Sequence, residues 1–175
     1  MSDTPAQPLH FHRKRNYQSV RKDKVVYLKC LLTDADSGET LSYRDDMVYL
    51  HGGYGSAFPK VEQALEGLQV DAVCDTTLEA ADAYGEPDPM LLLKVPADAI
   101  PAAARQIGME IEGEAEDGSS RPFRVTGIDE EGITVDGNHP LAGRRLHFKF
   151  EITDIRDASP QEITAGYGFA KAPVQ

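Results

Sequence analysis

Cysteine and histidine, the side chains that most often act as nucleophiles or metal ligands, are sparse and scattered in this sequence. Cys30 and Cys74 lie inside apolar, strand-like runs and belong to no Cys-x-x-Cys motif or Cys/His cluster. Neither a disulfide framework nor a structural zinc site is therefore indicated, and we expect reduced, buried thiols. His10 and His12 form the one close histidine pair, in a leader without periodicity, which favours an incidental pair over a ligand set. We predict no metal site and no cofactor.

Composition and charge narrow the class of protein. Of the 175 residues 41% are hydrophobic, which is enough for a core, and no apolar run approaches the ~18–20 residues that span a bilayer. The N-terminus lacks the apolar segment of a signal peptide, so we expect a cytoplasmic protein. The net charge is −11. Residues 1–24 nevertheless carry about +4, which leaves roughly −15 on the remainder, a body that repels nucleic acid.

Two elements can be placed in the first half of the chain. Residues 25–32 are apolar and β-branched and end at a turn over 34–38, which predicts a strand buried on both faces. Apolar residues then recur at helical spacing, with Pro59 near the start and Gly67 near the end of the pattern. The spacing predicts one short helix with a single apolar stripe, formed by Phe58, Val61, Leu65 and Leu68.

The second half of the chain is rich in strand patterns. Residues 70–78 resemble a strand, and 146–155 alternate apolar with polar side chains, which predicts a half-buried antiparallel strand. Between them, 97–105 is alanine-rich and predicts a short helix. Residues 109–116, 121–125 and 133–135 alternate between turns at 117–120 and 129–132 and predict a small meander. Such a segment forms a subdomain that leans on a larger body.

Several short motifs match one family. They are Tyr49-Leu50-His51-Gly52, Leu65-Glu66-Gly67, Asp82-Ala83-Tyr84-Gly85 and Val135-Asp136-Gly137-Asn138-His139-Pro140-Leu141-Ala142-Gly143. In this order they resemble the SlyD-like branch of the FKBP-type peptidyl-prolyl cis-trans isomerases, over residues 25–157. The resemblance implies an α+β fold, in which a half-open antiparallel sheet wraps over one short helix and an insert-in-flap meander is inserted.

The resemblance also sets the expected domain boundaries. Residues 1–24 form a basic, flexible N-terminal extension, and 25–86 with 136–157 form a discontinuous isomerase domain. Residues 87–135 are the insert-in-flap domain, and 158–175 are a short C-terminal tail. Members of this branch often end in a nickel-binding tail rich in histidine and cysteine, but 158–175 contain neither residue, so we expect no metal site there.

The implied activity is prolyl isomerisation with capture of unfolded polypeptide by the insert. The barrier to rotation about the peptide bond, ~18–20 kcal/mol, comes from lost resonance. A site that excludes water, holds the prolyl ring against apolar walls and aims a donor at the carbonyl lowers this barrier without a nucleophile. The residues that the resemblance assigns to catalysis are Leu41, Tyr49, Phe58, Val61, Tyr84 (the carbonyl donor) and Phe148. Those that it assigns to substrate binding are Ala57 and His139. On the insert, Leu92, Ile100 and Met109 are candidates for an exposed apolar patch that holds clients, and the alternative is that they pack the core of the subdomain.

Two departures from the family pattern lie at the implied pocket. Cys30 stands where the family usually has a tyrosine, and Ser42 stands where it usually has an aspartate. Both changes remove polar contacts, so we expect activity to be reduced or specificity altered. A shifted register that brings Asp45 or Asp46 to the pocket is the less favoured alternative.

Three hypotheses follow for the function. The first is a folding helper that couples isomerisation to client capture, and the second is a non-catalytic polypeptide-binding chaperone of the same fold. The third is an adaptor that docks through residues 1–24 on RNA or the ribosome. We favour the first, with a monomer that acts on unfolded or proline-containing polypeptides and makes no membrane contact.

Overall fold

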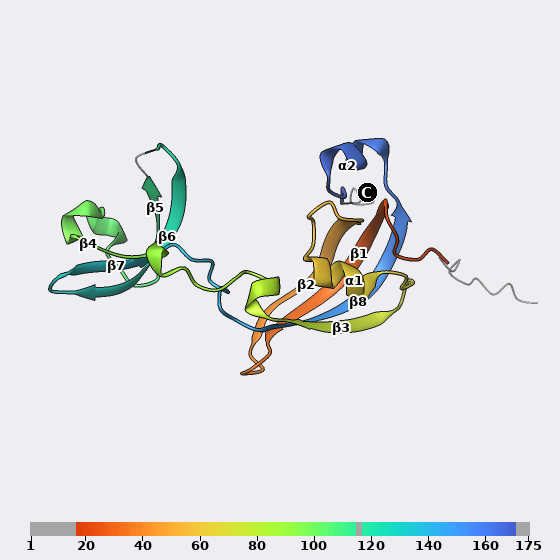
Figure 1. The fold of residues 1–175 in the computed structure, drawn as a ribbon, viewed down its shortest axis with the longest axis horizontal. Helices are drawn as coiled ribbons and strands as arrows, with labels where there is room; N and C mark the ends of the chain where they lie inside the picture. The colour runs from red at the N-terminus through yellow and green to blue at the C-terminus, as the bar shows by residue number, and fades with distance from the viewer. Residues whose placement is uncertain (1–16, 115–116, 171–175) are drawn as a thin grey trace, which may run out of the picture. The chain divides into compact units, whose positions relative to one another are not determined.

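A computed structural model describes residues 17–114 and 117–170 (Figure 1). Its α+β fold contains two four-stranded sheets, with the strand orders β2-β1-β8-β3 and β4-β7-β6-β5. The chain forms two compact units, and strands β1, β2, β3 and β8 each contribute residues to both. The first unit comprises 1–31, 42–75 and 149–175, and the second comprises 32–41 and 76–148. Among the described residues no helix is long and apolar enough to cross a membrane.

The first sheet is built from strands with one apolar face. Strands β1 (Lys24–Asp34), β2 (Thr40–His51), β3 (Val73–Leu78) and β8 (Leu146–Asp157) form it. The alternation predicted for 146–155 is confirmed, because Leu146, Phe148, Phe150 and Ile152 are all buried. The prediction that 25–32 is buried on both faces is wrong. Only alternate residues of β1 beyond Val26 are buried, since its other face is partly open to solvent.

Helix α1 (Pro59–Leu65) lies in the first unit and is shorter than the spacing predicted. Pro59 occupies its first turn, where a missing N–H costs no hydrogen bond, and Val61 and Leu65 are buried. The helix stops before Leu68 because Gly67 adopts a positive φ of 80°. The chain then pairs with the N-terminal segment, where the Val20 N–H donates to the Leu68 carbonyl at 2.8 Å.

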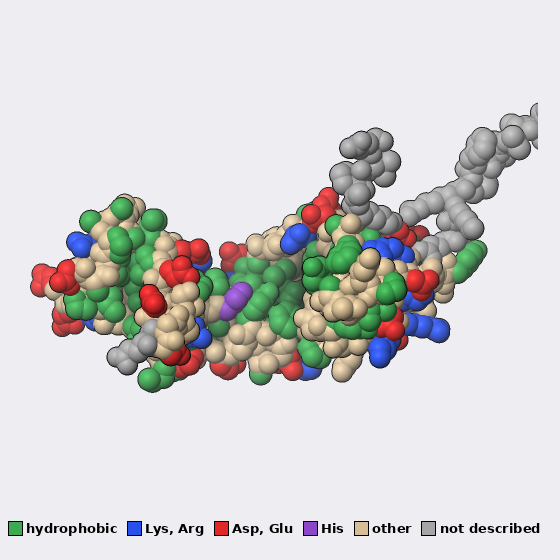
Figure 2. Space-filling model, turned by 90° about the horizontal axis from the view of Figure 1, so that it is seen from above, with side chains coloured by type: hydrophobic (Ala, Val, Ile, Leu, Met, Phe, Trp, Pro, Cys, Tyr) green, Lys and Arg blue, Asp and Glu red, His purple; other side chains and the backbone are tan. Residues whose placement is uncertain are grey.

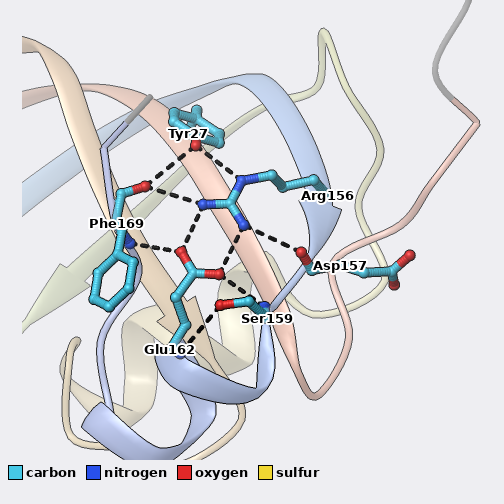
Figure 3. Close-up of polar contacts among 6 residues, drawn as sticks. All are labelled: Tyr27, Arg156, Asp157, Ser159, Glu162 and Phe169. Atoms are coloured by element: carbon cyan, nitrogen blue, oxygen red, sulfur yellow. Dashed lines mark hydrogen bonds and ion pairs between the residues drawn. The ribbon is translucent and has the colours of Figure 1, made fainter. Parts of the chain in front are cut away.

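Residues 17–24 are part of the fold, although a flexible extension was predicted over 1–24, and residues 160–165 of the tail form a helix for which no prediction was made from the sequence. Val20 is fully buried, so residues 17–24 belong to the folded first unit, while 1–16 lie outside the described residues. The tail forms helix α2 (Pro160–Ala165), whose capping box joins Ser159 to Glu162. The Glu162 carboxylate is buried and accepts hydrogen bonds from Arg156 at 2.6 and 2.8 Å (Figure 3). This ion pair fixes α2 to the end of β8.

The insert forms the second sheet, and the predicted meander is confirmed. Its strands are β4 (Leu92–Val95), β5 (Glu110–Glu114), β6 (Ser120–Asp129) and β7 (Gly132–Asp136), all paired antiparallel. Ile100, Val125, Ile133 and Val135 form its core. The helix predicted over 97–105 is wrong: two 3₁₀ turns, η3 (Ala97–Ala99) and η4 (Ala102–Ala104), flank Pro101, which cannot continue a helix. Two more 3₁₀ turns, η1 (Ala80–Asp82) and η2 (Pro89–Leu91), precede β4.

Candidate functional site

Tyr84 and His139 form a stacked pair in the second unit. Their ring centroids are 3.8 Å apart and their planes differ by 6°. His139 Nδ1 accepts a hydrogen bond from the Leu141 N–H at 3.0 Å, so a neutral ring carries its proton on Nε2. Tyr84 is 37% exposed. A phenol and an imidazole N–H at one place are donors of the kind that can bind a substrate carbonyl.

Two short loops position this pair. Tyr84 follows turn η1, which is closed by a hydrogen bond from the Gly85 N–H to the Ala80 carbonyl at 2.7 Å. The Gly85 carbonyl in turn accepts from the Gly143 N–H at 2.7 Å, which ties the Tyr84 loop to the His139 loop. Gly143 is required here because its φ is +75° and a Cβ would lie 2.9 Å from Pro87.

Leu41 and Phe148 also belong to the second unit, and both come from the first sheet. Phe148 lies on the buried face of β8 and is 8% exposed, while Leu41 is half-buried on β2. A buried phenylalanine is the kind of apolar wall that the prolyl ring requires. Phe148 is therefore both a core residue and a candidate wall.

Tyr49, the tyrosine of the Tyr-Leu-His-Gly motif, is buried in the first unit. Its hydroxyl lies 2.8 Å from His51 Nδ1, and His51 Nε2 lies 2.5 Å from the Glu66 carboxylate. Burial raises the pKa of Tyr49, so the phenol stays neutral. These two contacts connect β2 to Glu66, the residue that follows α1. The Tyr49 hydroxyl is therefore hydrogen-bonded within the fold.

The remaining candidates of the first unit surround the start of α1. Val61 is buried on the helix, and Ala57 and Phe58 are half-buried just before it. The Glu62 carboxylate accepts from the N–H of Gly53 at 3.1 Å and holds the preceding glycine loop. That these residues line one pocket with Leu41, Tyr84 and Phe148 stays a prediction from the sequence.

The two departures from the family pattern have clear local environments. Cys30 is buried, and burial raises the pKa of its thiol to about 11, so the thiol is neutral and weakly polar at pH 7. Ser42 is exposed on β2. Asp46 is exposed and pairs with Arg44 at 3.2 Å. Cys74 is only partly buried, so the expectation of two fully buried thiols is correct for Cys30 alone.

A hollow of about 520 Å³ lies in the second unit beside the His139 loop. Its apolar wall includes Pro87, Phe123 and Pro140, and its polar wall includes Arg121 and Asn138. His139, which the sequence assigned to substrate binding, also lines this hollow. The sequence placed Arg121 and Phe123 only in the meander and Asn138 and Pro140 only in the Asp-Gly-Asn-His motif, and it did not assign Pro87 to the site. The signal that could have found Phe123 is the glycine at 137, because a Cβ there would lie 2.7 Å from the Phe123 ring.

The insert exposes several large apolar side chains. Leu92 is 52% and Met109 is 39% exposed, and Figure 2 shows hydrophobic side chains on the surface of the insert. The other exposed apolar residues of the insert are Met90, Leu93, Ile107 and Ile128. Ile100, by contrast, is only 3% exposed and packs in the insert core. Its predicted contact with clients is therefore withdrawn.

Residues 17–114 and 117–170 hold no group of three or more His, Cys, Asp and Glu side chains that could bind a metal ion together. His10 and His12 lie outside these residues.

Comparison with curated proteins decides the family. The chain is 34% identical over 149 residues to the FKBP-type peptidyl-prolyl cis-trans isomerase SlyD of Treponema pallidum, which covers 83% of this chain and 84% of that protein. This chain belongs to the SlyD-type FKBP peptidyl-prolyl isomerases. SlyD of Aeromonas hydrophila is 38% identical over 82% of this chain and 68% of its own length. The family resemblance predicted from the motifs is thus confirmed.

The similarity to some SlyD proteins covers less of their length. SlyD of Escherichia coli K12 is 38% identical over 120 residues, which are 68% of this chain and 60% of that protein. This chain therefore spans less than two thirds of the E. coli SlyD sequence. No family model matches the chain.

Proposed function

We propose that this SlyD-type protein is a peptidyl-prolyl cis-trans isomerase that accelerates X-Pro isomerisation during protein folding, with an insert that holds unfolded polypeptide. The observation that carries the proposal is the match to the Treponema SlyD, because it spans most of both chains. That relative's name specifies the isomerase activity. The proposed domain boundaries are those predicted from the sequence, except that residues 17–24 join the folded unit.

The chemistry requires a dry apolar wall and one donor. Phe148 provides a buried aromatic wall, and the Tyr84 hydroxyl is the proposed donor to the carbonyl that precedes proline. His139 stacks on Tyr84 and limits the rotation of its ring. Because a twisted amide loses resonance, a site that favours this state needs no nucleophile, metal or cofactor. Tyr49, Leu41, Ala57, Phe58 and Val61 complete the proposed pocket.

A proline-containing tetrapeptide and a protein whose refolding is limited by proline isomerisation together test the proposal. Tyr84→Phe removes one neutral hydrogen bond of about 0.5–1.5 kcal/mol, so we expect a rate lower by about two- to tenfold on both substrates. Tyr43→Phe is the matched control, because Tyr43 is 60% exposed on β2. The site assignment is wrong if Tyr84→Phe and Phe148→Leu both keep the wild-type rate while remaining folded.

The second candidate function is a holder of unfolded chains without isomerase activity. Cys30 and Ser42 favour it, because a neutral buried thiol and an exposed hydroxyl replace the tyrosine and aspartate that the family pattern places there. The same assay separates the two functions. Suppressed aggregation without faster refolding supports the holder, whereas faster refolding supports the isomerase.

Client capture by the insert is tested on its exposed side chains. The double substitution of Leu92 and Met109 by serine removes two apolar side chains that are 52% and 39% exposed. We expect weaker suppression of aggregation at a temperature where the variant is still folded, and Tyr43→Ser is the control on the first sheet. Because part of both side chains is buried, the melting temperature should fall slightly. Deletion of residues 88–134 is expected to leave a folded body that no longer holds clients.

The remaining proposals concern location and partners. We propose a cytoplasmic monomer whose clients are unfolded or proline-containing polypeptides. The basic residues of 1–24 are proposed as a weak contact for RNA or the ribosome. Salt-dependent binding to RNA that disappears when residues 1–16 are deleted supports this contact.

A further inference from the structure

Two linkers connect the insert to the rest of the chain, and hydrogen bonds join them along their length. Residues 83–91, which include the first five residues of the predicted insert (87–135), lead into strand β4, and residues 137–145 follow strand β7. The Gly137 N–H donates to the Leu91 carbonyl at 2.9 Å, and the Gly143 N–H donates to the Gly85 carbonyl at 2.7 Å. The Tyr84–His139 stack also joins the two linkers. Between the two backbone bonds, one side chain supplies the hydrogen bonds from linker to linker.

That side chain is the carboxamide of Asn138. Its Oδ1 accepts from the Asp88 N–H at 2.7 Å, and its Nδ2 donates to the Asp88 carbonyl at 3.1 Å. The Asn138 amide thus satisfies both backbone polar groups of Asp88, as a neighbouring strand does. The Asp136 carboxylate accepts from Nδ2 at 2.8 Å and from the Asn138 backbone N–H at 2.9 Å, which fixes the side chain in this orientation.

These contacts exclude Asn138 as a donor to substrate. Both N–H groups of its carboxamide are already used within the linkers, one on Asp88 and one on Asp136. Two glycines of the second linker, Gly137 and Gly143, leave no room for a side chain. A Cβ at Gly137 would lie 2.7 Å from the Phe123 ring, and a Cβ at Gly143 would lie 2.9 Å from Pro87.

We propose that Asn138 is a positioning residue that makes the two linkers a single connection, and thereby couples client capture on the insert to prolyl isomerisation. The inference rests on the proposed function. Without the Asn138 side chain, only the two backbone bonds and the Tyr84–His139 stack join the linkers. A more loosely joined pair of linkers lets the insert move more freely, so a client held on it meets the isomerase residues at a lower effective concentration. Asn138 acts on the transfer of the client, and on neither client binding nor the chemical step.

The test compares three readouts of Asn138→Ala with those of the wild type. Acceleration of the proline-limited refolding of an unfolded protein is expected to fall about fivefold. Tetrapeptide isomerisation and suppression of aggregation are expected to stay within about twofold of the wild type, because neither requires the two functions to cooperate. Hydrogen exchange supplies a structural readout, since the Asp88 N–H loses its acceptor and should exchange faster.

The matched control is Gln106→Ala, which removes a carboxamide from the insert surface. Within the described part of the chain the Gln106 side chain makes no hydrogen bond. If Asn138→Ala fails to fold, Asn138→Asp retains the acceptor for the Asp88 N–H, loses both donors and faces the Asp136 carboxylate. It should give the same pattern of readouts.

Two results would overturn the inference while leaving the proposed function in place. One is that Asn138→Ala reduces the acceleration of refolding no more than Gln106→Ala does. The other is an equal loss in all three readouts, which indicates a merely structural role. A wild-type protein that accelerates neither the tetrapeptide nor refolding overturns the proposed function itself, and the inference with it.

Discussion

The buried ion pair between Arg156 and Glu162 should make the C-terminal helix essential for the stability of the first unit. Glu162 is 1% exposed and accepts four hydrogen bonds: two from Arg156, one from the Ser159 N–H at 2.8 Å and one from the Phe169 N–H at 2.7 Å. Figure 3 shows these contacts around the carboxylate. The change to test is Arg156→Ala, which leaves this carboxylate without its cation.

The expected magnitude follows from burial. Removing one partner of a buried pair costs about 3–5 kcal/mol, because the other charge stays desolvated. Arg156 is 32% exposed, so water replaces part of its contribution. We therefore expect about 2–3 kcal/mol, or about 4–12 °C in melting temperature for a chain of this size. Glu162→Gln keeps the shape and should cost less, because Arg156 retains the Tyr27 hydroxyl at 3.0 Å and the Phe169 carbonyl at 3.0 Å.

Urea unfolding followed by far-UV circular dichroism measures these costs. Arg44→Ala is the matched control, since Arg44 pairs with Asp46 on the surface and such pairs contribute about 0–1 kcal/mol. The two single changes and Arg156→Ala/Glu162→Gln form a double-mutant cycle. The reasoning is refuted if Arg156→Ala costs no more than Arg44→Ala, or if the cycle shows no coupling.

Three further predictions concern pH, packing and thiol reactivity. The Arg156 guanidinium holds the pKa of Glu162 well below its unfolded value of about 4.3. Its stabilisation is thus complete above about pH 5 and is lost as pH falls toward the folded pKa, so the stability gap between wild type and Glu162→Gln should shrink below pH 4. Gly137→Ala should displace the Phe123 ring and destabilise the insert by about 1–3 kcal/mol, measured by urea unfolding; an unchanged midpoint contradicts this. Cys30, with a pKa of about 11, should react with a thiol reagent at pH 8 far more slowly than Cys74 until urea exposes it, and equal rates in the folded protein contradict this.

The strands and the family could be predicted from the sequence because their signals are local. The alternation in 146–155 and the turns of the insert determine the elements directly, and the motif from Val135 to Gly143 is specific to the family. The 3₁₀ turns around Pro101 were missed because alanine content indicates helix while proline interrupts it. Helix α2 was missed although its local signals are present in the sequence: Ser159 and Glu162 form the capping box, Pro160 begins the helix and Gly166 ends it.

The candidate site could be predicted only as a set of residue types. Sequence alone assigned Tyr49 to the pocket but could not show that its hydroxyl is held by His51, because that contact depends on the fold of β2 against α1. It also assigned Ile100 to client binding, although the turn at Pro101 places this side chain in the insert core. The role of Asn138 was hidden because Asp88, its partner, lies 50 residues away in the chain.

The slot that holds Phe123 bears on how inserts can be exchanged between relatives. Its ring lies between Gly113 and Gly137, where an added Cβ would come within 2.7 Å on either side. Gly137 lies beyond the end of β7 and outside the boundary at 135 that the pattern suggested. A chimera cut at that boundary separates the ring from one wall of its slot. Grafts should therefore include position 137, and across related chains the sizes of residues 113, 123 and 137 should vary together.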